Sequence, residues 1–299
     1  MAHYFITGGS GFIGQRLCAR ILAQGDQVTV LSRQSAAKVE PLCGVGTRVI
    51  ASLDQLTTLQ PPDYVVNLAG EPILKGRWSH ARKSVLRHSR IDLTRRLIEV
   101  LAQLDTQPRA MVSGSAIGYY GDAGETLCTE HNPAGHDFAA TLCRDWELAA
   151  RTTQLPKTRL CVVRIGVVLD PAGGSLQQML TPFRLGLGGK IGNGKQWFSW
   201  ISRDDLCRLI LFLLGQDHCQ GVFNGTAPEP VRNIEFTQRL ASALHRPARL
   251  PVPATAMKLI LGEAASLLLA SQRVTPAAAM DAGFSFEHPT LKEALQALL

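Results

Sequence analysis

The sequence predicts an α/β fold: a Rossmann-like doubly wound parallel sheet with a smaller C-terminal substrate-covering region. A glycine-rich segment at 7–14, TGGSGFIG, lies between a short apolar run and a segment with apolar residues at helical spacing. Apolar runs and helical patterns then alternate through the first half of the chain, as in βαβ units. After residue 165 this spacing loosens, and glycine and proline become frequent. We therefore expect an NADP-binding domain at 1–165 and a covering region at 166–299, interleaved with the end of the sheet.

The glycine-rich segment predicts a nucleotide site. Its glycines include Gly8, Gly11 and Gly14, a GxxGxxG spacing instead of the GxGxxG of the archetypal fingerprint. A strand, a tight glycine turn and a helix hold a dinucleotide pyrophosphate, because backbone N–H groups and the positive helix end face the phosphates. An ordinary loop is the alternative, and the strand and helix on either side favour the nucleotide site.

The second strand, expected at 27–31, indicates which dinucleotide binds. An NAD enzyme places Asp or Glu at the end of this strand to bind the ribose 2′-hydroxyl. Here the strand ends in Leu31-Ser32-Arg33, and Asp26 lies in the turn before it. Because no carboxylate repels a 2′-phosphate, and Ser32 and Arg33 are able to donate to one, the sequence predicts NADP(H). The alternative is that Arg33 is a solvated loop arginine.

The remaining elements follow in order along the chain. Strands are expected at 48–50, 64–68, 110–113 and 159–165, and helices at about 79–104, 137–151 and 206–214. Asp204 and Asp205 precede the last of these helices. Carboxylates at a helix N-terminus stabilise it, so this role is favoured for the pair over acid–base chemistry.

Composition excludes several classes of protein. Hydrophobic residues make up 45% of the chain, which is enough for a packed core and too few for a membrane protein. The most apolar late stretch, 259–270, is too short to span a bilayer and is interrupted by Glu263. The seven cysteines are scattered without a CxxC pair, which argues against a disulfide framework or a metal site. We expect no signal segment and a cytoplasmic location.

The net charge of +7 is moderate, with one basic concentration at 77–96. A nucleic-acid surface, a solvated helix and a pocket for an anionic ligand are all compatible with this concentration. No aromatic interleaving or nucleic-acid motif accompanies it, so nucleic-acid binding is disfavoured. Arg184, Lys190 and Lys195 surround a glycine-rich loop that favours a small anionic substrate, phosphorylated or nucleotide-linked. A flexible surface loop is the alternative there.

Several motifs resemble those of the extended short-chain dehydrogenase/reductase superfamily: NLAG at 67–70, SGSAIGYYG at 113–121, FSWISRDD at 198–205 and GVFN at 221–224. Others resemble its atypical sugar-nucleotide-epimerase-like subgroup, the YfcH-like proteins. These are NLAGEPI at 67–73, RIGVVL at 164–169, PFRLGLGGKIGNG at 182–194 and a C-terminal DUF1731-type block at about 249–298. The resemblance covers essentially the whole chain. Position 190, a lysine here, looks like proline in many relatives.

The resemblance implies a Rossmann-like fold that binds NADP(H), with the substrate unassigned. It implies a pyrophosphate site at Gly8, Gly11, Phe12, Ile13 and Gly14, a 2′-phosphate site at Ser32 and Arg33, an adenosine side at Leu68 and Ala69, a cofactor contact at Arg90 and a nicotinamide neighbour in Val168. The position of Arg90 on the helix after the fourth strand agrees, because a cation is useful beside the phosphates. A solvated helix face is the alternative for Arg90.

The usual chemistry of short-chain dehydrogenases is absent. Their lysine lowers the pKa of the tyrosine phenol in a YxxxK helix, so that the phenol exchanges a proton while hydride moves. Phe138 and Leu142 occupy those two positions here. None of the four tyrosines in the chain is followed by lysine at that spacing. The candidate substitutes are Ser115, Tyr119 and Tyr120, which stand at the end of the fifth expected strand. The two tyrosines are also explained by closing the strand-end turn.

Two functions remain open from the sequence. The first is an oxidoreductase or nucleotide-sugar epimerase-like enzyme that uses NADP(H) and an atypical proton-transfer arrangement. The second is a non-catalytic NADP(H)-binding regulator or scaffold that retains the pocket without the chemistry. The missing YxxxK favours the regulator, whereas the glycine-rich loop at 186–194 favours the enzyme.

Overall fold

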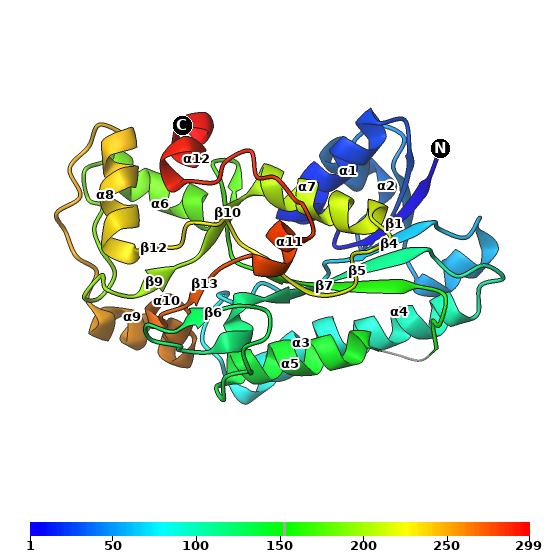
Figure 1. The fold of residues 1–299 in the computed structure, drawn as a ribbon, viewed down its shortest axis with the longest axis horizontal. Coiled ribbons are helices and arrows are strands. Elements are labelled where there is room, and N and C mark those ends of the chain that lie inside the picture. Colours follow the sequence, from blue (N-terminus) through cyan, green and yellow to red (C-terminus); the bar gives the residue numbers. More distant parts are fainter. Residues whose placement is uncertain (152–153) are drawn as a thin grey trace.

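The computed structural model describes residues 1–151 and 154–299 and has a seven-stranded parallel sheet at its centre (Figure 1). The strand order is β11-β7-β5-β4-β1-β2-β3, and every pair in it is parallel. The order reverses between β1 and β4, which is the switch point of a doubly wound sheet. The predicted fold class is confirmed.

The sheet strands agree closely with those expected from the sequence. They are β1 (His3–Thr7), β2 (Gln27–Leu31), β3 (Arg48–Ile50), β4 (Tyr64–Asn67), β5 (Ala110–Ala116), β7 (Arg159–Ile165) and β11 (Gly221–Gly225). The short pairs outside the sheet are β8 (Val167–Asp170) with β10 (Trp200–Ser202), β9 (Trp197–Phe198) with β12 (Val231–Arg232), and β6 (Leu127–Cys128) with β13 (Arg273–Val274). Strand β5 extends three residues beyond the expected end, because Gly114–Ala116 continue the register with β7.

Helices cover both faces of the sheet (Figure 1). One face carries α1 (Phe12–Ala23), α2 (Ala36–Cys43), α7 (Arg203–Gly215) and α11 (Ala277–Asp281). The other carries η1 (Leu53–Thr58), α3 (His80–Arg87), η2 (His88–Asp92), α4 (Leu93–Ala102) and α5 (Phe138–Ala150), while η3 (Ile117–Tyr120) follows β5. The helix expected at 79–104 therefore contains a π-helical turn, η2, at its middle. Helix α2 was not predicted; it is short and contains Pro41.

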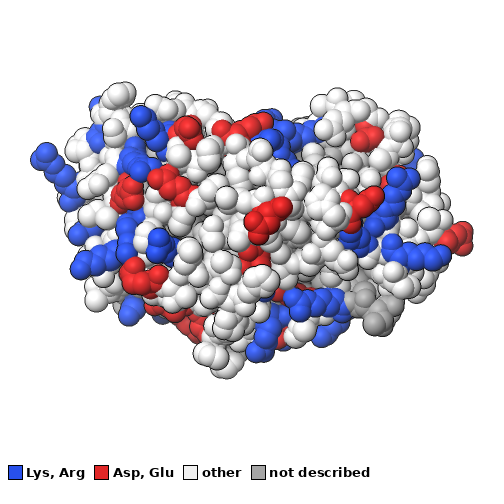
Figure 2. All heavy atoms as spheres, viewed as in Figure 1, with Lys and Arg blue, Asp and Glu red and all other residues white. Residues whose placement is uncertain are grey.

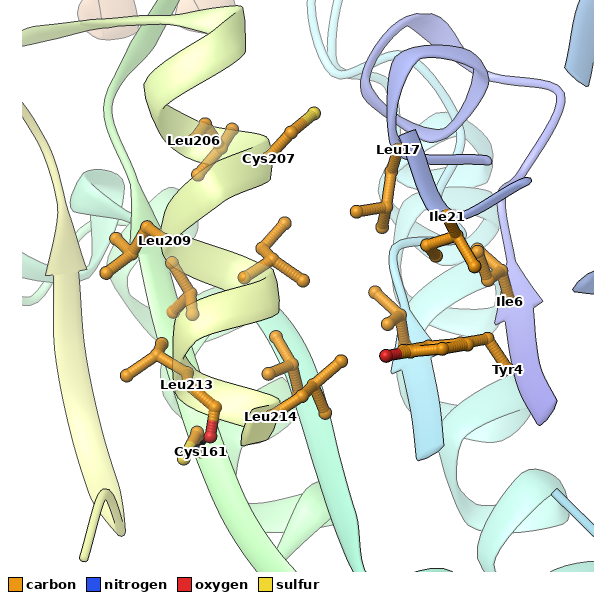
Figure 3. Packing of buried hydrophobic residues seen from close by; sticks show 14 of the residues in the cluster. Tyr4, Ile6, Leu17, Ile21, Cys161, Leu206, Cys207, Leu209, Leu213 and Leu214 are labelled. Carbon is orange, nitrogen blue, oxygen red and sulfur yellow. Dashed lines mark hydrogen bonds between the residues drawn. The ribbon is translucent and has the colours of Figure 1, made fainter. Parts of the chain in front are cut away.

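The main core lies between the sheet and α1, α2 and α7. Figure 3 shows Cys207 and Leu214 on the side of α7 that faces Leu17 and Ile21 of α1. Cys207, Leu17 and Ile21 have no exposed surface. Helix α7 and strand β11 both come from the second half of the chain. The second half of the chain therefore contributes a strand to the main sheet and a helix to its core. Its role in covering a substrate stays a prediction.

A second core lies at the opposite end of the molecule from β1 and α2 (Figure 1). It packs α6 (Gly174–Arg184), α8 (Asn233–Ala243) and α12 (Leu291–Leu298) around the fully buried Trp200. The segment α9 (Ala254–Leu261), η4 (Gly262–Ala265) and α10 (Ser266–Leu269) packs instead beside α5 and Trp78. The C-terminal block thus contacts both parts of the molecule.

Candidate functional site

The glycine turn is built from backbone atoms at close approach. Gly8 has a positive φ of 74°, and the N–H of Gly11 donates to its carbonyl at 2.9 Å. A Cβ on Gly14 would lie 2.3 Å from the Gly8 oxygen, and one on Gly8 would lie 2.8 Å from the carbonyl carbon of Leu68. No side chain fits at either position. Helix α1 begins directly after the turn, so its free N–H groups lie at this edge of the sheet.

A cleft of about 450 Å³ opens where β1, β2 and β4 end, and we call it the glycine-turn cleft. Five of the residues predicted to hold the cofactor line it: Gly8, Gly11, Ser32, Arg33 and Ala69. Residues without a predicted role also line it, namely Ser10, Leu31, Gln34, Ala51, Gly70, Glu71, Ser89 and Leu93. Three separate strand ends therefore contribute predicted cofactor residues to one cleft.

The other predicted cofactor residues lie outside the lining of this cleft. Gly14 is buried beneath the turn, and Ile13 packs against the main core. The Phe12 ring packs against the backbone at Gly173 and Gly174, where the chain enters α6. Val168 lies on β8, which follows β7 directly. Phe12 thereby joins the glycine turn to the second core, a contact that sequence spacing does not reveal.

Arg33 and Glu71 pair across the mouth of the glycine-turn cleft. An Nη2 of Arg33 donates to Glu71 Oε1 at 3.2 Å, and the Arg33 side chain is 93% exposed. The Ser32 hydroxyl accepts from the N–H of Gln34 at 3.0 Å. An exposed ion pair of this kind contributes little stability, so Arg33 is free to exchange its partner. Glu71 had no predicted role, and its position after NLAG was the only sequence signal.

Arg90 lies on the π-helical turn η2 and supports the wall of the cleft. It donates to the Glu71 carbonyl at 3.0 Å, and a Cβ on Gly70 would lie 2.8 Å from its guanidinium carbon. Among the described residues it has no carboxylate partner. Burial lowers the pKa of this guanidinium. Because Arg90 is half-buried and has no carboxylate partner among the described residues, a bound anion such as a phosphate would stabilise its charge.

The candidate catalytic residues belong largely to a buried polar network. Ser115 Oγ donates to Glu147 Oε1 at 2.8 Å, and Arg164 donates to both oxygens of the same carboxylate at 2.8 and 3.0 Å. Arg164 also donates to the Tyr120 hydroxyl at 3.0 Å, which in turn donates to Asn224 at 2.7 Å. Ser115 and Tyr120 therefore have protein partners for their hydroxyl groups.

Tyr119 differs from Tyr120 in its surroundings. The Arg164 guanidinium lies 3.4 Å from the centre of the Tyr119 ring, and the Tyr119 hydroxyl makes no hydrogen bond to a described residue. Burial raises the pKa of Tyr120 to about 12, although Arg164 and Asn224 oppose this. Tyr120 is thus a neutral phenol at ordinary pH, and Tyr119 is the candidate whose hydroxyl is uncommitted.

Carboxylates neutralise most of the basic concentration at 77–96. The ion pairs are Arg82–Glu71, Lys83–Glu263, Arg87–Asp145, Arg95–Asp92 and Arg96 with Asp54 and Glu99. Figure 2 shows positive and negative side chains interspersed on the visible face. The cations of this helix therefore serve intramolecular contacts.

Within residues 1–151 and 154–299, no cluster of three or more His, Cys, Asp or Glu side chains is arranged to hold a metal ion. All seven cysteines are buried with free thiols. No helix in this part of the chain has the length and apolarity that crossing a membrane requires.

Known proteins are similar to this chain in sequence and in fold. The "Epimerase family protein SDR39U1 homolog, chloroplastic" of Arabidopsis thaliana is 40% identical over 300 residues, which cover 98% of this chain and 86% of that protein. The crystal structure of human epimerase family protein SDR39U1 with NADPH matches with a TM-score of 0.90 and 36% identity, over 99% of this chain and 98% of that one.

A more distant structure shares the fold alone. UDP-glucuronic acid 4-epimerase from Bacillus cereus, in complex with UDP-glucuronic acid and NAD, has a TM-score of 0.77 and 16% identity, over 99% of this chain and 97% of that one.

Family models account for most of the chain in two parts. The DUF1731 model, a domain of unknown function, matches residues 252–298, which is close to the expected C-terminal block. The model of the NAD dependent epimerase/dehydratase family matches residues 4–224, from β1 into the last strand of the sheet. With this match, the glycine turn and the sequence identity above, the chain belongs to the NAD dependent epimerase/dehydratase family.

Proposed function

We propose that the chain is an NADP(H)-dependent oxidoreductase or epimerase-like enzyme that binds its cofactor in the glycine-turn cleft. The observation that carries this proposal is the meeting of Gly8 and Gly11, Ser32 and Arg33, and Ala69 in one cleft at three strand ends. The presence of NADPH in the human relative supports it.

The residues present fit NADP(H). The turn places backbone N–H groups where a pyrophosphate is held, and the end of β2 offers Ser32 and Arg33 without a carboxylate of its own. Arg90, behind Gly70, adds a positive charge without a carboxylate partner among the described residues. When bound, NADPH supplies a hydride from its nicotinamide. In a doubly wound sheet the nicotinamide half extends across the switch point toward β5 and β7.

Arg33→Ala is expected to weaken NADPH binding by about 10- to 100-fold and to leave NADH binding nearly unchanged. A charge-assisted hydrogen bond contributes about 1.5–3 kcal/mol, and only NADPH carries the 2′-phosphate that Arg33 would bind. Calorimetric titration of both cofactors measures the difference.

Glu71→Gln is the matched variant for this test. It removes the carboxylate that pairs with Arg33, so NADPH binding should be kept or strengthened. Equal affinities of the unmutated protein for NADH and NADPH would contradict the proposed role of Arg33.

Proton transfer is assigned, as a proposal, to Ser115, Tyr119 or Tyr120. The free hydroxyl of Tyr119 supports Tyr119 over the other two. We expect Tyr119→Phe to lower turnover at least 10-fold without changing NADPH affinity, because it removes one oxygen from a half-buried ring. Ser115→Ala and Tyr120→Phe are expected to act mainly on stability, since both hydroxyl groups are bound within the network. A substrate screen that follows NADPH absorbance, together with thermal unfolding, separates the two effects.

A non-catalytic NADP(H)-binding regulator is the second candidate. The absence of YxxxK and the engagement of Ser115 and Tyr120 in the buried network favour it. Unchanged turnover in Tyr119→Phe, Ser115→Ala and Tyr120→Phe would remove all three residues from the mechanism. Tight NADPH binding with no turnover of any substrate would favour the regulator.

The sequence also predicts a small anionic substrate, phosphorylated or nucleotide-linked, and a cytoplasmic location, and both stay predictions. The positive charges of Lys190 and Lys195 on the glycine-rich loop favour such a substrate, whereas the uncharged cavity described below favours a small neutral one.

A further inference from the structure

A second, partly enclosed cavity of about 70 Å³ lies where β5 and β7 end, and we call it the inner cavity. Its walls include Ile117, which follows β5, Val167 of β8, Ser175 and Met179 of α6, and Leu267 and Leu268 of α10. Strands β5 and β7 lie on the far side of the switch point from β2. A cofactor whose adenosine end occupies the glycine-turn cleft therefore has its reactive end near the inner cavity.

The inner cavity is uncharged. None of the residues that line it is Asp, Glu, Lys, Arg or His. Several of its polar groups hold the surrounding backbone: Asn233 Oδ1 accepts from the N–H of Ile191 at 2.8 Å, and Ser199 Oγ donates to the Gln272 carbonyl at 2.7 Å. The hydroxyl of Ser175 has no hydrogen-bond partner among the described residues. A phosphate or carboxylate would thus be buried here without a cation, which is costly.

Two arginines beside the cavity wall make contacts outside the cavity. Arg232 and Arg273 lie 4.1 and 4.6 Å from the ring centre of Trp197, a residue of the cavity wall. Arg232 is also paired with Glu125 at 2.6 Å. A negatively charged substrate would therefore have to compete with a carboxylate for Arg232.

The wall contributed by the C-terminal block is firmly attached. Gln272 Nε2 donates to the Gly121 carbonyl at 2.9 Å, and Ser271 Oγ donates to the Gly124 carbonyl at 2.6 Å. Strand β13 pairs with β6 in the same region. These contacts hold the wall in place, and the cavity behind it has room for a small molecule.

From its size, its neutrality and its free hydroxyl, we infer that the inner cavity is the substrate subsite and takes a small uncharged carbonyl compound or the corresponding alcohol, with its oxygen bound by Ser175. An apolar cavity of about 150 Å³ holds benzene, so this one has room for about three or four non-hydrogen atoms. Reduction of such a compound would consume NADPH and one proton from solvent and yield the alcohol and NADP⁺, the hydride going to the carbonyl carbon and the proton to its oxygen. The redox step rests on the proposed function, whereas the binding site does not.

Methyl NMR of the protein labelled at methionine tests the subsite without measuring turnover. Met179 lines the inner cavity, while Met111 is buried in the sheet and Met280 is exposed on α11, so these two serve as internal references. The probes are acetone and acetate, which have the same number of non-hydrogen atoms and differ in charge, and UDP-glucose. Each is titrated with and without NADP⁺.

Acetone is expected to shift the Met179 signal saturably, in the millimolar range, while acetate and UDP-glucose leave it unchanged. Ser175→Ala should weaken acetone binding about 2- to 10-fold, because a neutral hydrogen bond contributes about 0.5–1.5 kcal/mol. The matched control Ser242→Ala, exposed on α8, should not. A Met179 shift with acetate or UDP-glucose, or none with acetone, would overturn the inference. Unaltered acetone affinity in Ser175→Ala would overturn the role of Ser175. A separate NADPH titration shows independently whether the proposed function fails.

Discussion

Gly14→Ala is expected to weaken NADPH binding at least 100-fold. A Cβ at this position would lie 2.3 Å from the Gly8 oxygen and 2.6 Å from both the Cα and the oxygen of Gly9. All three are backbone atoms of the turn, so no side-chain rotation relieves the overlap. The turn must move away from α1, and its N–H groups then no longer face a pyrophosphate together. A 100-fold loss corresponds to about 2.7 kcal/mol of binding free energy.

Two other glycines provide a graded comparison. Gly215 ends α7, and a Cβ added there would have nothing within 4 Å, whereas one on Gly11 would meet only the Gly8 oxygen, at 3.1 Å. Calorimetry should therefore rank the loss of affinity as Gly14→Ala above Gly11→Ala, with Gly215→Ala unchanged. Thermal unfolding of the same variants shows how much of the effect is stability. Equal NADPH affinity in Gly14→Ala and Gly215→Ala would rule out this account of the turn.

Arg164→Met is expected to destabilise the fold by about 3–5 kcal/mol. Arg164 and Glu147 are only 2% and 3% exposed, and removal of one partner leaves the other charge buried and uncompensated. Burial by itself lowers the pKa of Arg164, but the hydrogen bond and charge of Glu147 outweigh it and raise that pKa overall. Glu147 also accepts a hydrogen bond from Ser115, and Arg164 donates one to Tyr120. The substitution therefore removes a contact that joins β5, α5 and β7. Urea unfolding measures the change.

The double variant Glu147→Gln with Arg164→Met removes both charges and is expected to recover most of the lost stability. Replacement of a buried ion pair by neutral groups of similar size is often nearly neutral. Arg144→Met is the exposed control, on the same helix as Glu147, because the Arg144 side chain is 52% exposed in its pair with Asp145. That change should cost less than about 1 kcal/mol. A similar loss in Arg164→Met and Arg144→Met would show that the network is not structural.

The sequence was sufficient to predict the sheet and the glycine turn. Each strand of the sheet's first half is a contiguous apolar run bounded by turn residues, and the parallel order follows from the alternation with helices. The turn is equally local, because residues 7–14 contain its glycines, the end of its strand and the start of its helix. The missing carboxylate after β2 and the missing YxxxK are also visible in contiguous residues. The π-helical turn at 88–92 and α2 were not predicted, and neither were the helices and short strand pairs of the second half other than α7, because the apolar spacing there is irregular.

The tertiary structure alone decided how distant residues meet. It pairs Arg33 with Glu71 and places the hydroxyl groups of Ser115 and Tyr120 in the network of Glu147 and Arg164. It also adds β11 to the main sheet and packs α7 against it. It also enclosed the inner cavity between β8, α6 and the C-terminal block. The two partners in these contacts are far apart in the sequence: Ser115 and Glu147 are separated by 32 positions, and Tyr120 and Asn224 by 104. They depend on the register of parallel strands and on the rotation of each helix against the sheet, which spacing within a single element does not encode.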